Sequence, residues 1–285
     1  MWQNLSWLVM AVAAVAPAFA DTLPVDLNDS DVSFGFLGGT ISNTGTSIVN
    51  GNVGATIGTI TGFGVGTGTA TGTVYPTSPS VPAAVTNAYT DFENAWSAAM
   101  NLTGATALTG LSTSQTLLGD TLYSLPAGTS STTGITLTFN AQNHANAVFI
   151  IQAPGNLTFN GAITFNLING ANPDNIFWIV GGDATISPSV NITFDGSILA
   201  GSAGGAFTMS AGTSGPFSGT INGCVFSNAA GTLAAATNIN GCSAFSGAAP
   251  EPGSSGLVSL GCLMGILAWR KARSIRSGAG SVEGN

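Results

Sequence analysis

Basic residues are nearly absent from this chain of 285 residues. It has four, and all of them lie within the last sixteen positions, from Arg270 onward. Between Asp21 and Ala249 there is no Lys or Arg, against nine Asp and one Glu. Such a region repels a phosphate backbone and has no cation to hold an acidic polysaccharide. Nucleic acid is therefore excluded as a partner of this region.

Residues for metal binding and catalysis are also scarce. His144 is the only histidine, so we expect no zinc site, which needs four ligands. A polysaccharide lyase would want a basic residue as proton acceptor, and this region has none. Only the carboxylates of Asp174, Asp183 and Asp195 could gather into the pair that a glycosidase uses. We predict that the chain is not an enzyme and that it has no catalytic residue, metal or cofactor.

Glycine and threonine dominate instead, and one short pattern keeps returning. The chain has 40 glycines, and only 6% of its residues are charged. The pattern is a threonine flanked by apolar residues, found in the stretches 137–140, 157–160, 184–187, 207–210 and, more loosely, 231–234. In a strand, such a threonine points away from its apolar neighbours. A strand pattern that returns every 20 to 27 residues predicts a mostly β fold, a β-solenoid with one hydroxyl residue per coil on a single outer face.

One helix interrupts the strand pattern. Ser80 suits the N-cap and Pro82 the first turn, and apolar residues then follow at spacings of three and four. We predict a helix over about 81–101 that packs its apolar stripe on the side of the solenoid. The continuous apolar runs 148–151 and 176–180 suit strands buried on both faces, between the core and this helix.

Two further stretches have weaker patterns. We expect residues 108–125 to connect the helix back to the coils. The run 67–73 carries a threonine at every second position, so on an extended chain the threonines would share one side. This run could form another binding rung or a polar loop. We favour the loop, because the other side of the run carries only Gly and Ala.

Both ends of the chain differ from the middle. Residues 1–20 form an apolar run that ends in an Ala-Phe-Ala pattern, which predicts a cleaved export signal. Residues 21–33 carry an acidic cluster that we interpret as a solvated lead, because a calcium loop would need a downstream Glu and a glycine turn. The predicted domain spans 34–247, and residues 248–285 form a separate tail.

The tail has three parts in a fixed order. Pro250-Glu251-Pro252 comes first, the apolar segment 256–269 follows, and basic residues over 270–273 come next. This order resembles the PEP-CTERM sorting signal of exopolysaccharide-producing bacteria. The resemblance implies a transmembrane helix that holds the domain outside the membrane until a sorting enzyme acts at the Pro-Glu-Pro site. We expect a secreted or cell-surface protein that contacts the membrane only through this tail.

The chain has three cysteines. Cys224 and Cys242 lie 18 residues apart within the repeats, while Cys262 lies in the apolar tail. In an oxidising compartment the first two could form a disulfide around the last coil, which would stabilise the fold by roughly 3 kcal/mol. The alternative, two buried free thiols, stays open.

Four stretches resemble the microbial ice-binding-protein-like (antifreeze) family of secreted solenoids, in the order found in that family. They lie within residues 41–63, 137–152, 167–181 and 195–200, and read ISNTGTSIVNGNVG with TGF, LTFNAQ with NAVFIIQ, LINGAN with NIFWIVG, and DGSILA. The resemblance spans about residues 34–242. It implies a right-handed, triangular β-solenoid with the helix packed alongside, and adsorption to ice through one flat face. After Gly219 the sequence departs from the family pattern, so the last coils could differ.

We place the ice-binding face on the hydroxyl residues of the repeated pattern. The predicted residues are Thr138, Thr158, Thr185, Ser187, Thr208, Ser210 and Thr232. Rungs of a sheet repeat every ~4.8 Å and alternate residues lie ~6.6–6.8 Å apart, so such a face is a two-dimensional grid. Outward threonine is also ordinary strand chemistry, which is the simpler interpretation of the pattern. Two rival functions stay open: a matrix or adhesin module associated with exopolysaccharide and, less favoured, a carbohydrate-active β-helix enzyme.

Overall fold

The computed structural model describes residues 34–242, except 76, 133, 145, 188–189, 202–203, 211–217 and 235. These residues form parallel β-sheets and one α-helix, so the described fold is mostly β, as predicted. The predicted export signal 1–20, the lead 21–33 and the tail from 248 onward lie outside the described residues. In the described part, no helix is both long and apolar enough to cross a membrane.

The described strands form four sheets in which all pairings are parallel. The eight-stranded sheet has the order β7 (Thr106–Ala107), β9 (Thr121–Ser124), β12 (Phe149–Ala153), β15 (Ile176–Val180), β18 (Ser197–Ala200), β21 (Val225–Ser227), β1 (Phe34–Gly38) and β4 (Asn52–Ala55). The seven-stranded sheet has the order β10 (Thr129–Ser130), β13 (Leu157–Asn160), β16 (Ala184–Ser187), β19 (Phe207–Met209), β22 (Ala230–Leu233), β2 (Thr40–Asn43) and β5 (Ile60–Thr61).

The remaining strands form two smaller sheets. The three-stranded sheet has the order β8 (Gln115–Leu118), β11 (Ile135–Asn140) and β14 (Ile163–Ile168). The five-stranded sheet has the order β17 (Ile192–Asp195), β20 (Ser218–Asn222), β23 (Ala236–Ile239), β3 (Ile48–Val49) and β6 (Thr69–Ala70). A short 3-10 helix, η1 (Pro173–Asn175), precedes β15.

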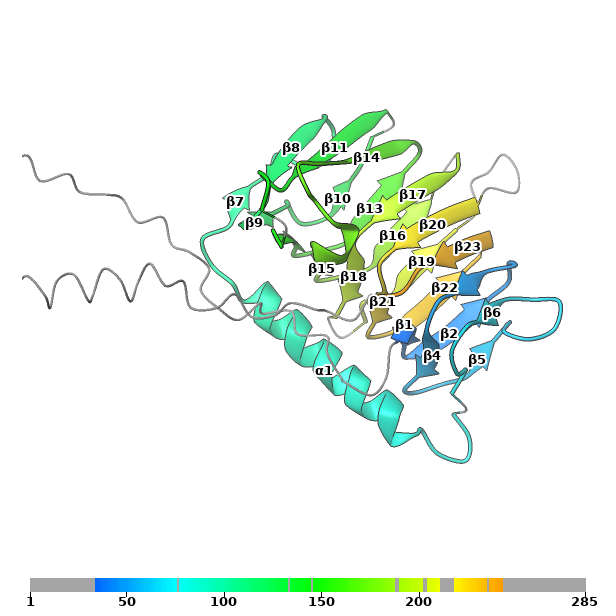
Figure 1. Cartoon of the computed structure of the whole chain (residues 1–285). Coiled ribbons are helices and arrows are strands. Elements are labelled where there is room, and N and C mark those ends of the chain that lie inside the picture. The colour runs from blue at the N-terminus through cyan, green and yellow to red at the C-terminus, as the bar shows by residue number, and fades with distance from the viewer. Residues whose placement is uncertain are drawn as a thin grey trace, which may run out of the picture. The chain divides into compact units, whose positions relative to one another are not determined.

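Successive strands pass from sheet to sheet and return one rung further along. From β12 in the eight-stranded sheet the chain enters β13 in the seven-stranded sheet and then β14 in the three-stranded sheet, before β15 pairs with β12. In the later circuits the five-stranded sheet takes the third place. We call one such circuit a coil. Figure 1 shows β13, β16, β19 and β22 following one another along the stack.

The first strands of the chain lie beside the last ones. The strands β1, β2 and β3 pair with β21, β22 and β23, respectively. In Figure 1 the blue N-terminal strands therefore continue the row of yellow and orange strands. The chain builds these end coils first, crosses the stack through the helix, and then winds back towards them. The end of the repeat region is thus covered by residues about 190 positions earlier in the chain, as in the contact between Asn50 and Asn240.

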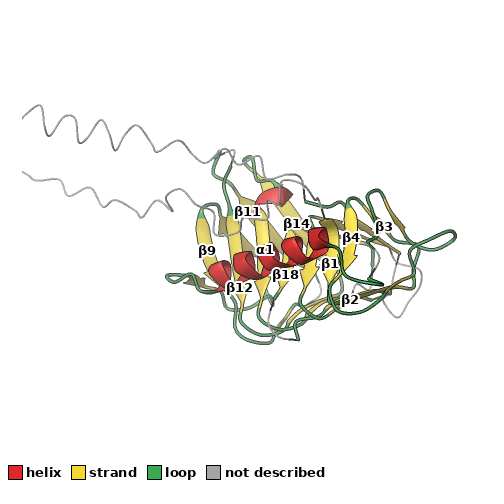
Figure 2. Ribbon diagram, turned by 90° about the horizontal axis from the view of Figure 1, so that it is seen from below, coloured by secondary structure: helices red, strands yellow, loops and turns green. Residues whose placement is uncertain are grey.

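The helix α1 (Ala83–Met100) lies across the outside of the eight-stranded sheet (Figure 2). Its buried residues are Val85, Phe92, Ala95 and Ala99. The predicted N-cap at Ser80 is wrong. The capping position is Pro82, whose ψ of 147° is extended and whose carbonyl accepts hydrogen bonds from the N–H groups of Val85 and Thr86. The helix therefore begins one residue after the proline, at Ala83.

The eight-stranded sheet is buried on both faces, as the apolar runs predict. All five residues of β12 and all five of β15 are buried. Side chains such as Ile151 and Trp178 point into the core between the sheets, while Ile150 and Phe177 belong to the cluster that packs under the helix. Only this sheet has the helix over it, which leaves the outer sides of the other sheets uncovered by α1.

Two side chains tie the helix to this sheet. Trp96 donates from Nε1 to the carbonyl of Val180 at 2.9 Å, and a Cβ on Gly201 would lie 2.2 Å from the Trp96 ring. Buried Gln152 of β12 donates through Nε2 to three carbonyls at the end of the helix. They belong to Ala99 (2.8 Å), Met100 (3.2 Å) and Leu102 (3.1 Å). Carbonyls at a helix C-terminus lack partners within the helix, so Gln152 acts as their cap.

One corner of the coils repeats a two-residue sequence. The strands of the five-stranded sheet end in pairs that lead into the eight-stranded sheet: Asp195-Gly196, Asn222-Gly223, Asn240-Gly241 and Asn50-Gly51. Gly196 and Gly241 have φ values of 110° and 78°, which side-chain-bearing residues rarely adopt. A Cβ on Gly196 would also lie 2.7 Å from the side chain of Ile176. These glycines let the chain turn sharply within van der Waals contact of the next coil.

Two expectations about the connections are wrong. The stretch 108–125 is no simple connector, because it contains β8 and most of β9 and so forms part of the first coil, with Leu117 and Leu122 buried. The run 67–73 is only partly a loop, because Thr69 pairs with Ile48 in β6 at the edge of the five-stranded sheet. After Gly219, where the family pattern is lost, β20 to β23 still continue the same winding.

Candidate functional site

A row of hydroxyl side chains runs along the outer side of the seven-stranded sheet. The paired positions, from one edge of the sheet to the other, are Ser130, Thr158, Thr185, Thr208, Thr232, Ser42 and Thr61. Every rung of this sheet thus carries Ser or Thr at the same register. Because neighbouring strands lie about 4.8 Å apart, the row repeats at that spacing. We call these seven residues the hydroxyl row.

The alternation of each strand places the row on the outside. In β16, Ala184 and Ile186 are buried, while Thr185 between them is partly exposed. The same alternation occurs in β13, β19 and β22. The inward residues join the core between the sheets, and this packing fixes the strands whose other side carries the threonines.

The central hydroxyls of the row are available to a ligand. In the described part of the chain, the side chains of Thr158, Thr185, Thr208 and Thr232 have no hydrogen-bond partner, and all four are partly exposed. At one end of the row the hydroxyl of Ser130 accepts a hydrogen bond from Asn160 Nδ2 at 2.9 Å. The row therefore presents a methyl group and an unsatisfied hydroxyl on each of four consecutive rungs.

A second polar row lies beside the first, two residues further along each strand. Asn160 pairs with Ser187, and the hydroxyl oxygens of Ser187 and Ser210 lie 2.7 Å apart in a hydrogen bond. This bond joins successive rungs and restricts the rotamers of both serines. The second row adds uncharged polar groups to the same face, so the face is broader than one residue per strand.

One carboxylate lies at the margin of this face. Asp183 is exposed, and it precedes β16. Its Oδ1 accepts a hydrogen bond from the N–H of Ala206 at 3.0 Å, and its own N–H donates to Asn156 Oδ1 at 3.0 Å. The side chain is thus held along the edge of the rungs. The residues of the hydroxyl row and of the second row are all uncharged.

Six of the seven predicted site residues lie on this face, and one does not. Thr158, Thr185, Ser187, Thr208, Ser210 and Thr232 lie together on the outer side of the seven-stranded sheet. The prediction that Thr138 shares their face is wrong, because Thr138 lies on β11 of the three-stranded sheet, between Thr116 and Asn166. Thr138 precedes Thr158 by 20 residues, whereas the true neighbour Ser130 precedes it by 28. A spacing shorter than one coil leads to a different sheet.

Three members of the hydroxyl row were not predicted from the sequence: Ser130, Ser42 and Thr61. Ser42 and Thr61 each follow an isoleucine in a short Thr-Ile-Ser or Thr-Ile-Thr piece, which is the same alternation as in the repeats. They lie early in the chain, and only the pairing of β2 with β22 brings them into the row. Ser130 lies in a two-residue strand whose pattern is too short to identify.

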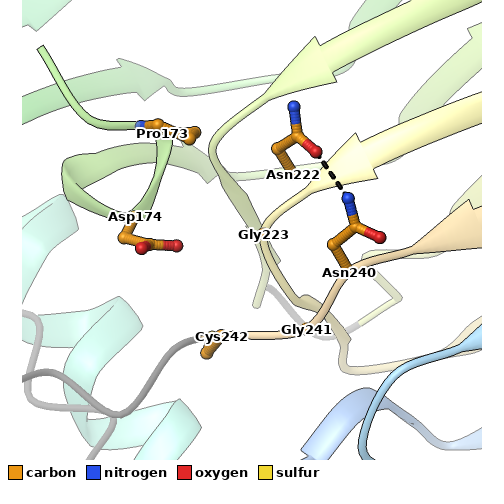
Figure 3. Close-up of a pocket in the computed structure, with 7 residues that line it drawn as sticks. All are labelled: Pro173, Asp174, Asn222, Gly223, Asn240, Gly241 and Cys242. Carbon is orange, nitrogen blue, oxygen red and sulfur yellow. Dashed lines mark hydrogen bonds between the residues drawn. The ribbon is translucent and has the colours of Figure 1, made fainter.

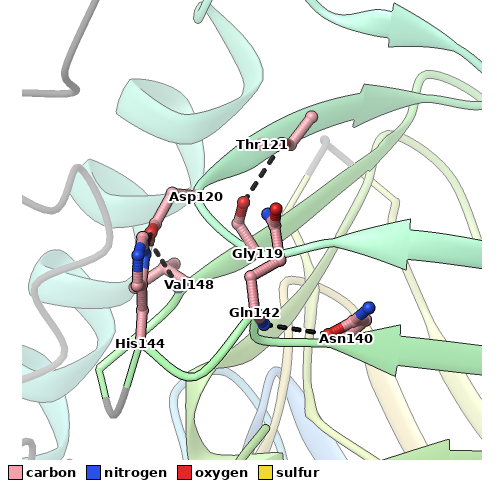
Figure 4. Close-up of polar contacts among 7 residues, drawn as sticks. All are labelled: Gly119, Asp120, Thr121, Asn140, Gln142, His144 and Val148. Atoms are coloured by element: carbon pink, nitrogen blue, oxygen red, sulfur yellow. Dashed lines mark hydrogen bonds and ion pairs between the residues drawn. The ribbon is translucent and has the colours of Figure 1, made fainter. Parts of the chain in front are cut away.

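The single histidine lies at a different corner of the coils (Figure 4). His144 Nδ1 lies 3.1 Å from Asp120 Oδ2, and Asp120 Oδ1 accepts a hydrogen bond from the N–H of Val148 at 3.1 Å. Both charged side chains are well exposed, and the contact joins two neighbouring coils. Within the described residues, no three His, Cys, Asp or Glu side chains come together.

The buried carboxyl of Asp195 belongs to a row of amides at the Asn-Gly corner. Burial raises the pKa of Asp195, while a hydrogen bond from Asn222 Nδ2 at 2.7 Å acts in the opposite direction. The row continues through Asn240, whose Nδ2 donates to Asn222 Oδ1 at 2.6 Å (Figure 3). A cavity of about 280 Å³ lies beside these amides and is bounded by η1 and Cys242. Asp183, by contrast, is exposed at the edge of another sheet, so the two carboxyls do not form the pair of a glycosidase.

The two cysteines of the repeat region lie against each other. Cys224 and Cys242 form a disulfide in the structure, with their Cα atoms 4.9 Å apart. Cys224 follows the corner after β20, and Cys242 follows the equivalent corner after β23. The bridge therefore joins the last two coils of the repeat region beside the Asn-Gly corner.

Comparisons with known proteins point to one family. A family model described as Ice-binding-like matches residues 37–242, which is nearly all of the described domain. A search of curated proteins finds no match.

Solved structures of similar fold carry related descriptions. An ice-binding protein from the Antarctic ascomycete Antarctomyces psychrotrophicus is 26% identical, with a TM-score of 0.62 over 75% of this chain and 97% of that one. A glycosylated ice-binding protein from an Arctic yeast is 24% identical, with a TM-score of 0.55 over 74% and 95%. The DUF3494 domain of an ice-binding protein from Shewanella frigidimarina is 21% identical, with a TM-score of 0.53 over 78% and 97%. The latter two similarities concern the fold alone.

Proposed function

We propose, from the premise that the chain belongs to the ice-binding-like family, that it adsorbs to ice through the hydroxyl row of its seven-stranded sheet. The observation that carries the proposal is the register, which stacks seven Ser and Thr residues on consecutive rungs without a charged residue among them. The expected activity is that of an antifreeze protein, namely ice shaping or inhibition of ice recrystallisation.

The mechanism follows from the chemistry of threonine on a rigid sheet. Each threonine offers a methyl group, which orders neighbouring water, and a hydroxyl, which can anchor that water. A single contact of this kind is weak, so adsorption has to sum many of them without losing side-chain entropy at each one. β-branched side chains on a packed sheet have few rotamers to lose. The hydroxyl row therefore favours a water layer whose spacing matches the sheet, and that layer joins the ice lattice.

The seven-stranded sheet suits this role better than the eight-stranded one. The helix covers the outer side of the eight-stranded sheet, where residues such as Phe177 and Ile179 are buried. The side chains of the hydroxyl row instead face solvent and keep their hydrogen-bonding groups free. The absence of Lys and Arg from the region 21–249 also keeps strongly hydrated ammonium groups away from the ice.

The test is to place bulky side chains on two central rungs. Thr185→Tyr with Thr208→Tyr would lift the face from the ice, and ice recrystallisation inhibition should require about tenfold more protein or worse. Tyrosine is a good strand former, so the fold should persist, and circular dichroism checks this.

The matched control is Thr86→Tyr with Thr90→Tyr on the exposed side of the helix. It makes the same chemical change away from every sheet and should leave activity at the wild-type level. Full activity of the sheet variant, with the control also active, would place the ice-binding face elsewhere. A wild-type protein that leaves a growing ice crystal round and unshaped would favour a matrix module over an ice-binding protein.

The finer description of the fold is part of the same proposal. Strand–connection–strand units in parallel sheets are right-handed in nearly all proteins, which supports a right-handed solenoid here. Each coil contributes one strand to each of three directions, which supports a triangular cross-section. The domain would span 34–247.

Export and sorting also belong to the proposal. The apolar N-terminal run supports export through a cleaved signal, and the Pro250-Glu251-Pro252 tail supports temporary membrane anchoring until a sorting enzyme acts. An ice-binding protein has to meet ice outside the cell, so a secreted or cell-surface location fits the activity. We assign no enzyme activity, because the family and the similar structures are described as ice-binding proteins.

A further inference from the structure

The three-stranded and five-stranded sheets carry a second row of polar side chains on their outer side. The paired residues are Thr116, Thr138 and Asn166 in the three-stranded sheet, and Thr193, Thr220, Asn238, Ile48 and Thr69 in the five-stranded sheet. The strands β14 and β17 lie beside each other, so the two sheets follow one another along the stack. We call these eight residues the second outer row.

This row shares the chemical features of the hydroxyl row. It contains no charged residue, and seven of its eight positions are Thr or Asn. In the described part of the chain, Thr116, Thr193, Thr220 and Asn238 have no side-chain hydrogen-bond partner. The eighth position, Ile48, is 44% exposed and adds an apolar group to the row. Free hydroxyls, an amide and methyl groups thus face solvent at a common register.

The neighbouring row of amides holds this side of the coils rigid. Asn222 donates to Asp195 at 2.7 Å, Asn240 donates to Asn222 at 2.6 Å, and Asn50 donates to Asn240 at 3.3 Å. These bonds link four successive coils along the edge of the five-stranded sheet (Figure 3). Each bond fixes the rotamers of two side chains, so a ligand that spans the rungs meets groups that are already ordered.

Strand propensity alone does not explain the composition of this side. Threonine is a good strand former, but asparagine is depleted in strands. Asparagine nonetheless occupies two positions of the second outer row, Asn166 and Asn238, and its amide offers both a donor and an acceptor. Asn166 also donates to the Thr138 hydroxyl on the next rung, at 3.4 Å. The side chains are therefore selected for hydrogen bonding in register, as on the hydroxyl row.

We propose that the second outer row is a second ice-contacting face. This inference rests on the proposed function. The two rows lie on different sheets of each coil, so they face in different directions and would present two separate grids to ice. A protein with two such faces would adsorb to more than one set of crystal planes. It would also keep part of its activity when one face is blocked.

The experiment compares the wild-type protein with variants of each face on single ice crystals. Fluorescently labelled full chain is adsorbed to a polished ice hemisphere, and the stained planes are recorded. Thr193→Tyr with Thr220→Tyr blocks the second outer row, Thr185→Tyr with Thr208→Tyr blocks the hydroxyl row, and a fourfold variant blocks both. We expect each double variant to lose one set of planes and keep the other, and the fourfold variant to stain none. Thr86→Tyr with Thr90→Tyr is the control and should match the wild type.

The outcomes separate this inference from the proposed function. If the variant of the second outer row stains the same planes as the wild type at the same concentrations, the inference is overturned and the proposed function stands. The same holds if blocking the hydroxyl row alone removes all staining. If the wild type stains no plane, both proposals fail. Should the Thr193/Thr220 variant unfold, Thr116→Tyr with Thr138→Tyr tests the same row through the three-stranded sheet, with the same two overturning results.

Discussion

At the scale of single residues, Asp195 stands out as a buried carboxyl at the start of a row of amides. Burial raises its pKa from the ordinary value of 3.8, because the charged form loses its hydration. A raised pKa means that the folded state binds the proton more tightly than the unfolded state does. The carboxyl therefore favours folding at low pH, and its contribution falls as the pH rises from below 3.8 through the raised pKa. At neutral pH the ionised carboxyl makes the fold less stable than a neutral group would.

This reasoning predicts that Asp195→Asn stabilises the protein at neutral pH. The amide keeps an oxygen to accept the hydrogen bond from Asn222 and has no charge to bury. The gain in the free energy of unfolding should grow as the pH rises through the titration of the carboxyl and should then level off. Urea unfolding at a series of pH values measures it. The opposite substitution, Asn222→Asp, puts two carboxyls side by side and should destabilise the fold. A destabilised Asp195→Asn variant would show that the charge has a partner that favours it.

At the scale of elements, the attachment of α1 depends on a few polar contacts within an apolar interface. Gln152 donates to three carbonyls at the end of the helix, and Trp96 donates to the sheet from the middle of it. Gln152→Leu would keep the volume but leave those carbonyls without a donor. We expect the free energy of unfolding to fall by about 1–3 kcal/mol, the usual cost of an unsatisfied buried polar group.

Urea unfolding of this variant, followed by the helical signal in circular dichroism, tests the prediction. Gln152→Glu is the informative companion, because its carboxylate would face the same carbonyls with an acceptor and should cost at least as much. The exposed Gln142, at the corner after β11, provides the control, and Gln142→Leu should leave stability nearly unchanged. Equal stability of the wild type and Gln152→Leu would mean that water replaces the lost donor.

The elements also show what can be read from the sequence. The repeated Thr pattern predicts the strands β13, β16, β19 and β22 and their common outer face, because inside–outside alternation is local in the chain. It cannot fix the register between coils. Thr138 has the same local pattern as Thr158, yet it lies on a different sheet because the chain between them is shorter than one coil.

The same distinction explains the remaining differences. The helix is recognisable from its apolar stripe, but its first residue depends on the extended ψ of Pro82. Ser42 and Thr61 join the hydroxyl row through the pairing of β2 with β22, which connects the two ends of the domain. No local pattern reports such a contact. The outer faces are thus predictable one strand at a time, while their full extent requires the stacking order.

At the scale of the whole molecule, the last coils are held by a covalent bond as well as by pairing. The disulfide between Cys224 and Cys242 closes a loop of 18 residues. Replacing both cysteines by serine should lower the free energy of unfolding by about 2–4 kcal/mol, through the greater freedom of the unfolded chain. Intact mass before and after reduction shows whether the bridge is present in the purified protein. Stability unchanged by reduction would favour two buried thiols.

Ice adsorption is also a property of the whole molecule, because the hydroxyl row works only as a continuous array. Thr185 lies in the interior of the row, between Thr158 and Thr208, while Thr61 lies on the last rung. A tyrosine at Thr185 would hold the ice away from rungs on both sides, whereas a tyrosine at Thr61 would disturb only the end. We predict that Thr185→Tyr lowers recrystallisation inhibition by about tenfold and Thr61→Tyr by less than about threefold, when both are assayed at equal concentration. Equal losses would contradict a single plane that sums its contacts, since each rung would then act alone. A larger loss at Thr61 would move the contact towards the N-terminal coils, where Thr59, Thr61 and the exposed Ile57 lie close together in the chain.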